Sequence, residues 1–187
     1  MHLICIVTFI IIVTIQNEKG HRMFVGRKQE LATLERLYRS DAFQMPVVYG
    51  RRRVGKTSLI AEFVKGKPAI FFSARESTAK ENLVALSQAI ADLRLDGTLV
   101  ASDTAAPVFA SFEEAFTHVF TLAQQQRIVL VIDEFPYLAQ SDRSVSSVLQ
   151  HLIDRHKENS RLFLILCGSS MSFMEHQVLG YKSPLYG

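Results

Sequence analysis

Gly50-Arg51-Arg52-Arg53-Val54-Gly55-Lys56-Thr57 fits the pattern G-x-x-x-x-G-K-[ST], in which glycines let the backbone turn with its N–H groups facing inward. Such a turn makes a cradle for anionic oxygens, and a helix that follows it points its positive end at the same place. We therefore predict a phosphate-binding loop. In this loop Lys56 would reach the β- and γ-phosphates of a nucleoside triphosphate, and the Thr57 hydroxyl would bind Mg²⁺.

The flanks of the loop fit this prediction. The short apolar run 46–49 before it is typical of a buried strand. Apolar residues recur at helical spacing after it, at Leu59, Ile60, Phe63 and Val64. Gly66 then favours the end of a helix, and Pro68 blocks its continuation. The motif requires a strand, a glycine loop and a helix in this order, so a surface turn rich in glycine and arginine is the less favoured alternative.

The composition fits one globular domain. The chain has 187 residues, of which 48% are apolar and 21% charged. Its net charge of +3 is too small to indicate a nucleic-acid partner by itself. Cys5 and Cys167 form no C-x-x-C pair, so neither a zinc site nor a disulfide framework is indicated. A reducing, cytoplasmic environment fits this cysteine usage best.

Residues 3–15 are almost all apolar and mostly β-branched. The run is short for a membrane span, which needs about 20 residues, and it lacks the cationic start and cleavage site of a signal peptide. It is either an N-terminal membrane anchor or a segment outside the working protein, which would then begin at Met23. We favour the second interpretation, so that residues 1–22 are an extension and residues 23–187 are the domain. A membrane partner is then not expected.

The segment that follows Met23 predicts a helix. Leu31, Leu34, Leu37 and Tyr38 mark one helical face. The helix either packs on the core from the surface or forms part of a clamp for a nucleotide base. In the second case Gly26 and Arg27 would lie near the adenine or the phosphates.

Further apolar stretches alternate with helical patterns along the chain. Strands are predicted at 69–73, 128–132 and 161–167, helices after the caps at 78–81 and 111–114 and over 143–157, and a loop over 96–110. This alternation predicts an α/β fold with a parallel sheet and right-handed crossovers.

Two polar sites follow predicted strands. Asp133 and Glu134 come directly after the run 128–132, and a parallel strand presents its ligand-binding residues at its carboxyl end. Asp133 would hold Mg²⁺, usually through water, and Glu134 would polarise the water that attacks the γ-phosphate. After the run 161–167, Ser169 or Ser170 would either lie beside the γ-phosphate or cap the next short helix.

With these residues assembled, the chain resembles the archaeal-type ATPases of the STAND/AAA-like P-loop group, from Met23 to its end. Five ordered motifs carry the resemblance: Phe24-Val25-Gly26-Arg27-x-x-Glu30-Leu31, Tyr49 to Thr57, Ile132 to Leu138, Cys167-Gly168-Ser169-Ser170-Met171, and Ser183 to Gly187. The resemblance implies a three-layer P-loop NTPase sandwich with strand order 5-1-4-3-2, and ATP and Mg²⁺ as ligands. It also implies that Gly50 to Ser58 bind phosphates, with Arg51, Arg52, Arg53 and Val54 in the loop. Glu134 would be the catalytic carboxylate, Asp133 a metal-site residue and Ser169 the sensor.

The same resemblance implies that the domain is incomplete at its C-terminus. Relatives continue beyond the last motif into an arginine, a fifth strand, a helical lid and often a DNA-binding domain. The chain is therefore a truncated product, a partial gene model, or a domain that borrows these parts from another copy or a protein partner. Arginine fingers contribute roughly 10³–10⁵ in rate, so we expect slow or absent turnover from this chain.

Two functions follow from these expectations. The favoured one is an ATPase that uses Glu134 to activate water. The alternative is a nucleotide-dependent switch with little or no turnover, associated with a protein partner or with DNA. For Arg51, Arg52 and Arg53, loop residues that face solvent or phosphate are favoured over direct DNA contacts.

Overall fold

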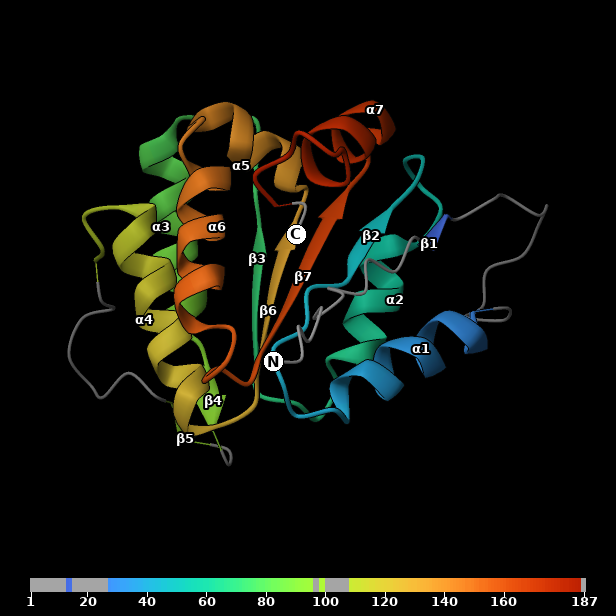
Figure 1. Cartoon of the computed structure of the whole chain (residues 1–187), viewed down its shortest axis with the longest axis horizontal. Coiled ribbons are helices and arrows are strands. Elements are labelled where there is room, and N and C mark those ends of the chain that lie inside the picture. The colour runs from blue at the N-terminus through green and yellow to red at the C-terminus, as the bar shows by residue number, and fades with distance from the viewer. Residues whose placement is uncertain (1–12, 15–26, 96–97, 100–107, 186–187) are drawn as a thin grey trace, which may run out of the picture.

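The computed structural model describes residues 13–14, 27–95, 98–99 and 108–185. Its main sheet is entirely parallel, with the spatial order β1-β2-β7-β6-β3 (Figure 1). These strands are β1 (Val13–Thr14), β2 (Val47–Tyr49), β3 (Ala69–Ser73), β6 (Ile128–Asp133) and β7 (Leu162–Gly168). The four strands other than β1 have the predicted order 1-4-3-2, which confirms the expected core topology.

The two central strands explain why their sequences are continuously apolar. Every residue of β6 and β7 is buried, whereas β3 at the edge of the sheet alternates between buried and partly exposed positions. Both faces of β6 and β7 are covered, so an apolar side chain is favoured at each position. Asp133 is buried as well, at the carboxyl end of β6.

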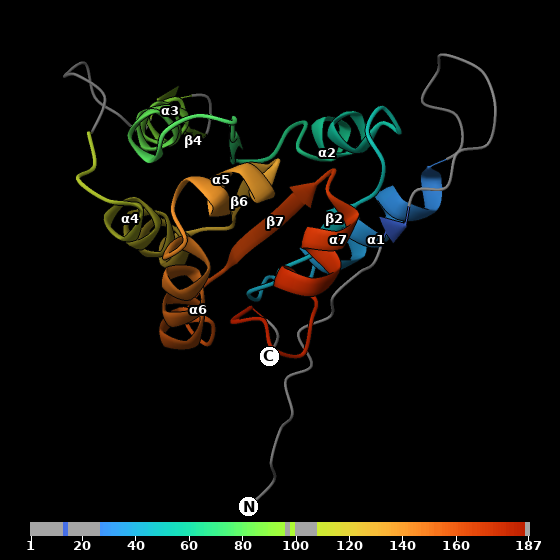
Figure 2. The same cartoon turned by 90° about the horizontal axis from the view of Figure 1, so that it is seen from above.

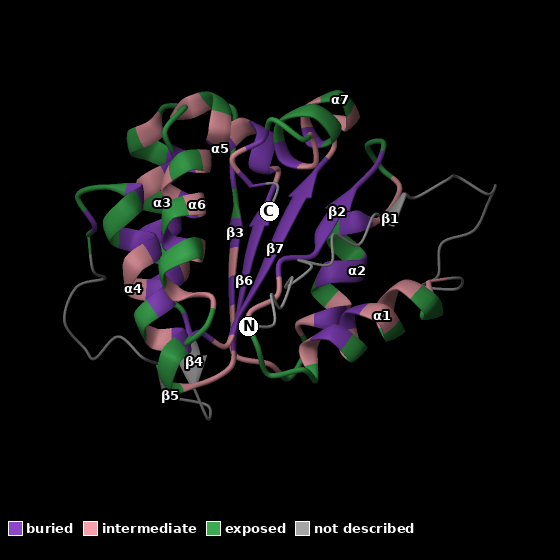
Figure 3. Ribbon diagram, viewed as in Figure 1, coloured by how far each residue is buried: buried purple, intermediate pink, exposed green. Residues whose placement is uncertain are grey.

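Helices cover both faces of the sheet and make three layers (Figure 2). One face packs against α1 (Lys28–Tyr38) and α2 (Lys56–Phe63). The other packs against α3 (Ala79–Ala91), α4 (Phe112–Gln125), α5 (Phe135–Ser141) and α6 (Val145–His156). The short helix α7 (Met171–Phe173) and the π-helical turn η1 (Met174–Val178) follow β7. Figure 3 shows the buried strands between these partly exposed helices. The predicted three-layer α/β sandwich is confirmed.

The predicted helix caps form as the sequence indicates. Thr78 Oγ1 accepts a hydrogen bond from the Glu81 backbone N–H at 3.2 Å, and the Glu81 carboxylate accepts one from the Thr78 backbone N–H at 3.0 Å. Ser111 Oγ likewise accepts from the Glu114 N–H at 3.1 Å at the start of α4. Each cap satisfies backbone donors that the first turn of a helix leaves unpaired.

Arg127, the residue directly before β6, connects the C-terminal end of α1 to the sheet. Its guanidinium donates hydrogen bonds to the carbonyls of Leu37 at 3.4 Å, of Arg161 at 3.0 Å and of Ala42. The same group lies 4.9 Å from the centre of the Tyr38 ring, where the cation is attracted by the ring face. Burial lowers the pKa of Arg127. These contacts orient α1, whose opposite end approaches the phosphate-binding loop.

The outer edge of β2 holds a strand that the sequence did not predict there. Val13 and Thr14 of β1 pair in parallel with Val48 and Tyr49 of β2. They belong to the apolar run 3–15, and the rest of that run lies outside the described residues. The position next to β2 is the one in which the resemblance places a fifth strand.

A second small sheet corrects the predicted loop at 96–110. The strands β4 (Arg94–Leu95) and β5 (Thr98–Leu99) pair antiparallel, so the prediction of a loop is wrong at Thr98–Leu99. The overlooked sequence signal is Asp96-Gly97, because Asp-Gly between two short strands favours a two-residue hairpin turn. Residues 96–97 and 100–107 themselves lie outside the described residues. Within the described part of the chain, no helix combines the length and apolar character that crossing a bilayer requires.

Candidate nucleotide-binding site

The glycine-rich stretch forms a tight connection between β2 and α2, as its pattern indicates. Gly55 immediately precedes α2 and has a φ of 82° and a ψ of 26°, a left-handed conformation that residues with a Cβ adopt at a cost. Arg53 also has a positive φ, of 64°. Such left-handed residues turn successive backbone N–H groups toward one concave side. The loop therefore has the backbone form of an anion cradle at the N-terminus of α2.

Lys56 lies folded over the inside of this loop. Its side chain is only 6% exposed, and Nζ donates hydrogen bonds to the Gly50 carbonyl at 2.9 Å and the Arg51 carbonyl at 3.0 Å. A buried ammonium needs such partners, because removal of a charge from water is costly. The two carbonyls hold the positive charge at the centre of the cradle. Of the other loop residues, Val54 is half-buried, and the first turn of α2 exposes Thr57 and Ser58.

Asp133 faces the phosphate-binding loop from the end of β6. Its Oδ2 accepts a hydrogen bond from the Thr57 hydroxyl at 3.0 Å, and its Oδ1 accepts one from the Glu134 backbone N–H at 3.1 Å. The two residues expected at a metal site are thus in direct contact, although 76 positions separate them in the sequence. They bring a hydroxyl and a carboxylate oxygen together, the hard donors that Mg²⁺ prefers.

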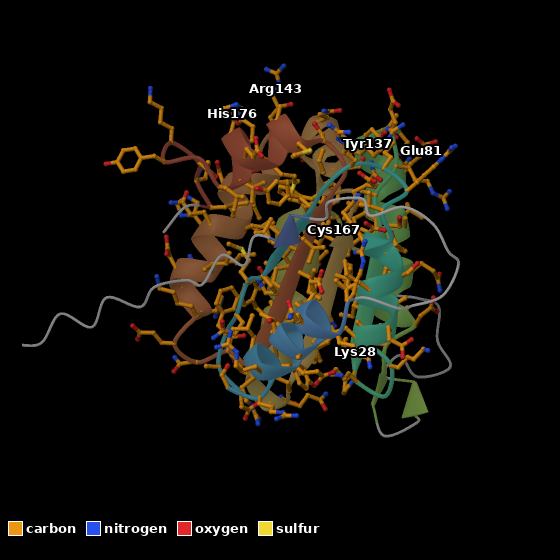
Figure 4. All side chains as sticks on the ribbon, turned by 90° about the vertical axis from the view of Figure 1, so that its right-hand side faces the viewer. Lys28, Glu81, Tyr137, Arg143, Cys167 and His176 are labelled. Carbon is orange, nitrogen blue, oxygen red and sulfur yellow. The ribbon has the colours of Figure 1, made fainter. Side chains whose placement is uncertain are left out.

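Cys167 on β7 borders Asp133 and contributes no soft ligand. Burial raises the pKa of the Cys167 thiol, and the neighbouring Asp133 carboxylate raises it further. The thiol therefore stays protonated at neutral pH, whereas a metal-binding cysteine acts as the thiolate. Figure 4 shows Cys167 deep within the fold and Tyr137 nearer the end of the molecule that carries Arg143 and His176.

Glu134 turns the chain from β6 into α5. Its φ of 52° and ψ of 46° are left-handed, which is uncommon for a residue other than glycine. Its carboxylate Oε2 accepts two hydrogen bonds from Ser169, from the backbone N–H at 3.1 Å and from the hydroxyl at 2.9 Å. The sequence allowed Ser169 or Ser170 to cap the following helix, but neither side chain forms a cap hydrogen bond there. The hydroxyl of Ser169 bonds to Glu134 instead.

Gly168 permits this contact by letting β7 approach the start of α5 closely. A Cβ at Gly168 would lie 2.7 Å from the Met174 sulfur and 2.9 Å from Cδ of Pro136. Both distances are shorter than van der Waals contact allows. Only glycine fits without movement of its neighbours, so the tight packing at Gly168 sets how near Ser169 comes to Glu134.

Arg27 reaches the loop from the N-terminal end of α1. Atoms of its guanidinium lie 3.7 and 3.8 Å from where a Cβ on Gly55 would stand. Its Nη1 is buried and has no hydrogen-bond partner among the described residues, and burial lowers the pKa of Arg27. A buried donor with no partner is costly, and it is a natural contact for an anionic or polar ligand. Gly26, the other residue of this predicted clamp, lies outside the described residues.

The three loop arginines are all exposed, and one of them makes a contact that the sequence did not predict. Arg52 Nη2 donates a hydrogen bond of 2.5 Å to the Tyr137 hydroxyl on α5. This bond joins the phosphate-binding loop to the helix that follows Glu134. Tyr137 had no signal in the sequence beyond its place in a motif, because its role depends on how α5 is oriented.

Comparisons with known proteins agree with this geometry. A model of the ATPase domain found predominantly in Archaea matches residues 24–187. The chain is similar to the uncharacterized protein MJECL04 of Methanocaldococcus jannaschii, with 34% identity over 165 residues that cover 88% of this chain and 34% of that protein. It is also similar to the uncharacterized ATP-binding protein MJ0423 of the same organism. That match has 51% identity over 48 residues, which cover 26% of this chain and 81% of that protein.

A solved structure shares the fold. The Walker-type ATPase PABY2304 of Pyrococcus abyssi superposes with a TM-score of 0.63 and 25% sequence identity, over 87% of this chain and 51% of that one. The chain thus spans about a third of MJECL04 and about half of PABY2304. Because the family model extends over every strand and helix that carries the site, the chain belongs to the family of ATPase domains found predominantly in Archaea.

Proposed function

We propose that this domain binds ATP with Mg²⁺ in the loop of residues 50–58 and hydrolyses the bond to the γ-phosphate. The observation that supports this best is the hydrogen bond from Thr57, beside the loop lysine, to Asp133, beside the candidate catalytic carboxylate. It joins the anion cradle to the acidic pair at one edge of the sheet. A site for a triphosphate and a metal ion needs the positive cradle and the negative carboxylates close together.

Binding would exchange bonds that the loop now makes with itself. Lys56 donates to two loop carbonyls, and the same ammonium would instead donate to β- and γ-phosphate oxygens. The backbone N–H groups of the loop and the N-terminus of α2 would bind the remaining phosphate oxygens. The buried Nη1 of Arg27, which has no partner in the described part of the chain, would donate to the base or to a phosphate beside Gly55.

Thr57 and Asp133 would hold the metal ion, since their oxygens are adjacent and hard. When bound, Mg²⁺ would neutralise charge that develops on the phosphate oxygens. Glu134 would orient the attacking water and accept its proton.

The test of this function is phosphate release by wild type and by the Glu134→Gln variant. Loss of a general base lowers rates by about 10²–10⁴-fold, so release by the variant should fall to background while ATP still binds. Glu62→Gln is the matched control, because Glu62 is partly exposed on α2 and pairs with the exposed Lys65. Equal release by wild type and Glu134→Gln, above background, would show that Glu134 is not the base.

Nucleotide affinity tests the binding half of the proposal separately. The Lys56→Ala variant should lose about 10–100-fold in ATP affinity, the effect of one charge-assisted hydrogen-bond donor. The Lys65→Ala variant should bind ATP as wild type does, because the Lys65 side chain is exposed and pairs with Glu62, away from the loop. If Lys56→Ala binds as tightly as wild type, the loop does not bind phosphate in the way proposed.

A second candidate function is a nucleotide-dependent switch with little turnover. The two hydrogen bonds that Ser169 donates to Glu134, from its backbone N–H and its hydroxyl, favour the switch. They occupy the carboxylate that would otherwise activate a water molecule. Tight ATP binding with negligible phosphate release from wild type would support the switch. As partners of either function we propose another copy of this chain, a different protein, or DNA. A salt-insensitive or undetectable DNA interaction of this chain would exclude a direct role for Arg51, Arg52 and Arg53.

A further inference from the structure

The hydrogen bond from Arg52 to Tyr137 connects the two sides of the proposed nucleotide site. Arg52 directly follows Arg51, whose carbonyl accepts a hydrogen bond from the Lys56 ammonium at 3.0 Å. Tyr137 lies one helical turn after Glu134, and its backbone N–H donates to the Glu134 carbonyl at 2.9 Å. The Arg52 side chain therefore extends from the loop that would bind the phosphates to the turn that follows the candidate catalytic carboxylate.

The place of α5 determines which phosphate this guanidinium would approach. In-line attack places the water opposite the leaving oxygen, beyond the γ-phosphate. In the proposed function Glu134 activates that water, and α5 begins at the next residue, Phe135. A guanidinium held on the first turns of α5 would thus lie at the γ-phosphate end of the nucleotide. A diphosphate has no group at that end.

The bond to Tyr137 leaves the Arg52 guanidinium able to bind a second acceptor. In the described part of the chain this group makes one hydrogen bond, from Nη2 to the Tyr137 hydroxyl at 2.5 Å. A guanidinium has five N–H donors in a planar fork that matches a pair of phosphate oxygens. The tyrosine hydroxyl is uncharged, so it does not neutralise the arginine. Both the positive charge and further donors remain for a phosphate.

A long exposed side chain loses rotamer freedom when a ligand fixes it, and this loss weakens binding. The half-buried Tyr137 fixes the end of the exposed Arg52 before a ligand arrives. We propose that Arg52 binds the γ-phosphate and that Tyr137 is the positioning residue that holds its guanidinium for this contact. This inference rests on the proposed function and adds to it how the site distinguishes a triphosphate from a diphosphate.

Titration calorimetry of the full chain with Mg²⁺ tests this inference, using ADP and the non-hydrolysable β,γ-imido analogue of ATP. The variants are Tyr137→Phe, Arg52→Ala, Arg52→Lys, and Tyr137→Phe combined with Arg52→Ala. Arg51→Ala is the matched control for the loss of charge. It removes a positive charge from an exposed position of the same loop and keeps the carbonyl that accepts from Lys56.

We expect Arg52→Ala to weaken binding of the imido analogue about 10–100-fold, the effect of one hydrogen bond between charged groups. Tyr137→Phe should weaken it about threefold to tenfold, because the arginine must then be ordered during binding. In the Arg52→Ala background the same tyrosine substitution should change it by less than about twofold. Arg52→Lys keeps the charge and loses the fork, so it should keep only part of the affinity.

ADP distinguishes a contact with the γ-phosphate from a general effect on the loop. Tyr137→Phe should change ADP affinity by less than about twofold, since it removes no charge. The Arg52→Ala variant should lose no more ADP affinity than Arg51→Ala does. The Arg51→Ala variant itself should lose affinity for ADP and for the analogue by similar factors.

The outcomes separate this inference from the proposed function. If Tyr137→Phe weakens ADP and the analogue equally, or leaves both unchanged, the inference is refuted and the nucleotide site stands. An equal effect of Tyr137→Phe with and without the Arg52 guanidinium refutes it as well. If wild type binds neither nucleotide, both proposals fail. Where Arg52→Ala folds poorly, Arg52→Lys keeps the test decisive, because wild-type analogue affinity in that folded variant refutes a role of the fork.

Discussion

Replacing Gly168 with alanine tests the packing that sets the distance between Ser169 and Glu134. The added Cβ would stand 2.7 Å from the Met174 sulfur and 2.9 Å from Cδ of Pro136, where ordinary contacts begin at 3.4 Å. Relief requires a movement of about 0.5 Å between the end of β7 and Pro136 at the start of α5, and a movement of about 0.7 Å by the Met174 sulfur on η1. Overpacking of this size costs about 1–3 kcal/mol of folding free energy. A displacement near 1 Å at reacting groups also lowers rates about 100-fold.

Two measurements check this prediction. Urea unfolding should give a lower midpoint for Gly168→Ala with an unchanged slope. The rate of phosphate release should fall by more than the decrease in the folded fraction accounts for. Gly66→Ala is the matched control: Gly66 has a φ of 71°, and apart from its chain neighbours no described residue has an atom within 4 Å of its Cβ position. That variant should lose about 1–2 kcal/mol from backbone strain and keep its activity per folded molecule. Wild-type stability and wild-type release in Gly168→Ala would refute the reasoning.

Three further predictions concern contacts away from the loop lysine. The effects of Arg52→Ala and Tyr137→Phe on ATP affinity should be non-additive, because both remove the same hydrogen bond, although Arg52→Ala also removes a positive charge from the loop; additive effects by calorimetry would contradict this. Arg127→Met should lower the free energy of unfolding by about 2–4 kcal/mol, since it removes three carbonyl partners and a ring contact. A stability within about 0.5 kcal/mol of wild type by urea unfolding would contradict it. Because burial raises the folded pKa of Cys167 above its ordinary value of 9.0, its proton stabilises the fold and stability should fall as pH rises above about 9. Cys167→Ala should flatten that fall in unfolding curves at pH 8–10, and an equally steep fall in the variant would show that another group causes it.

The core of the fold follows from the sequence because burial on both faces of a sheet leaves a simple pattern. The runs 128–132 and 161–167 are continuously apolar, and the structure places them at the centre of the sheet. The proximity of Thr57 and Asp133 follows as well, since the carboxyl ends of parallel strands share one edge.

Other features depend on geometry that a pattern does not contain. The apolar, β-branched run 3–15 suits an anchor and a buried strand equally, so the pairing of Val13 and Thr14 with β2 could not be foreseen. The bonds of Arg52 to Tyr137 and of Ser169 to Glu134 depend on side-chain rotamers and on the orientation of α5. The close approach at Gly168 depends on how β7, α5 and η1 pack together. The presence of a glycine in the sequence does not predict that packing.

The hydrogen bonds that assemble the site also indicate at which stage of folding the site can form. Thr57 and Asp133 are 76 positions apart, and Arg52 and Tyr137 are 85 apart, so no local segment can form the site alone. Contacts of such long range close late, after the entropy of large loops has been overcome. Nucleotide should therefore bind only chains that have finished folding and draw the equilibrium toward them.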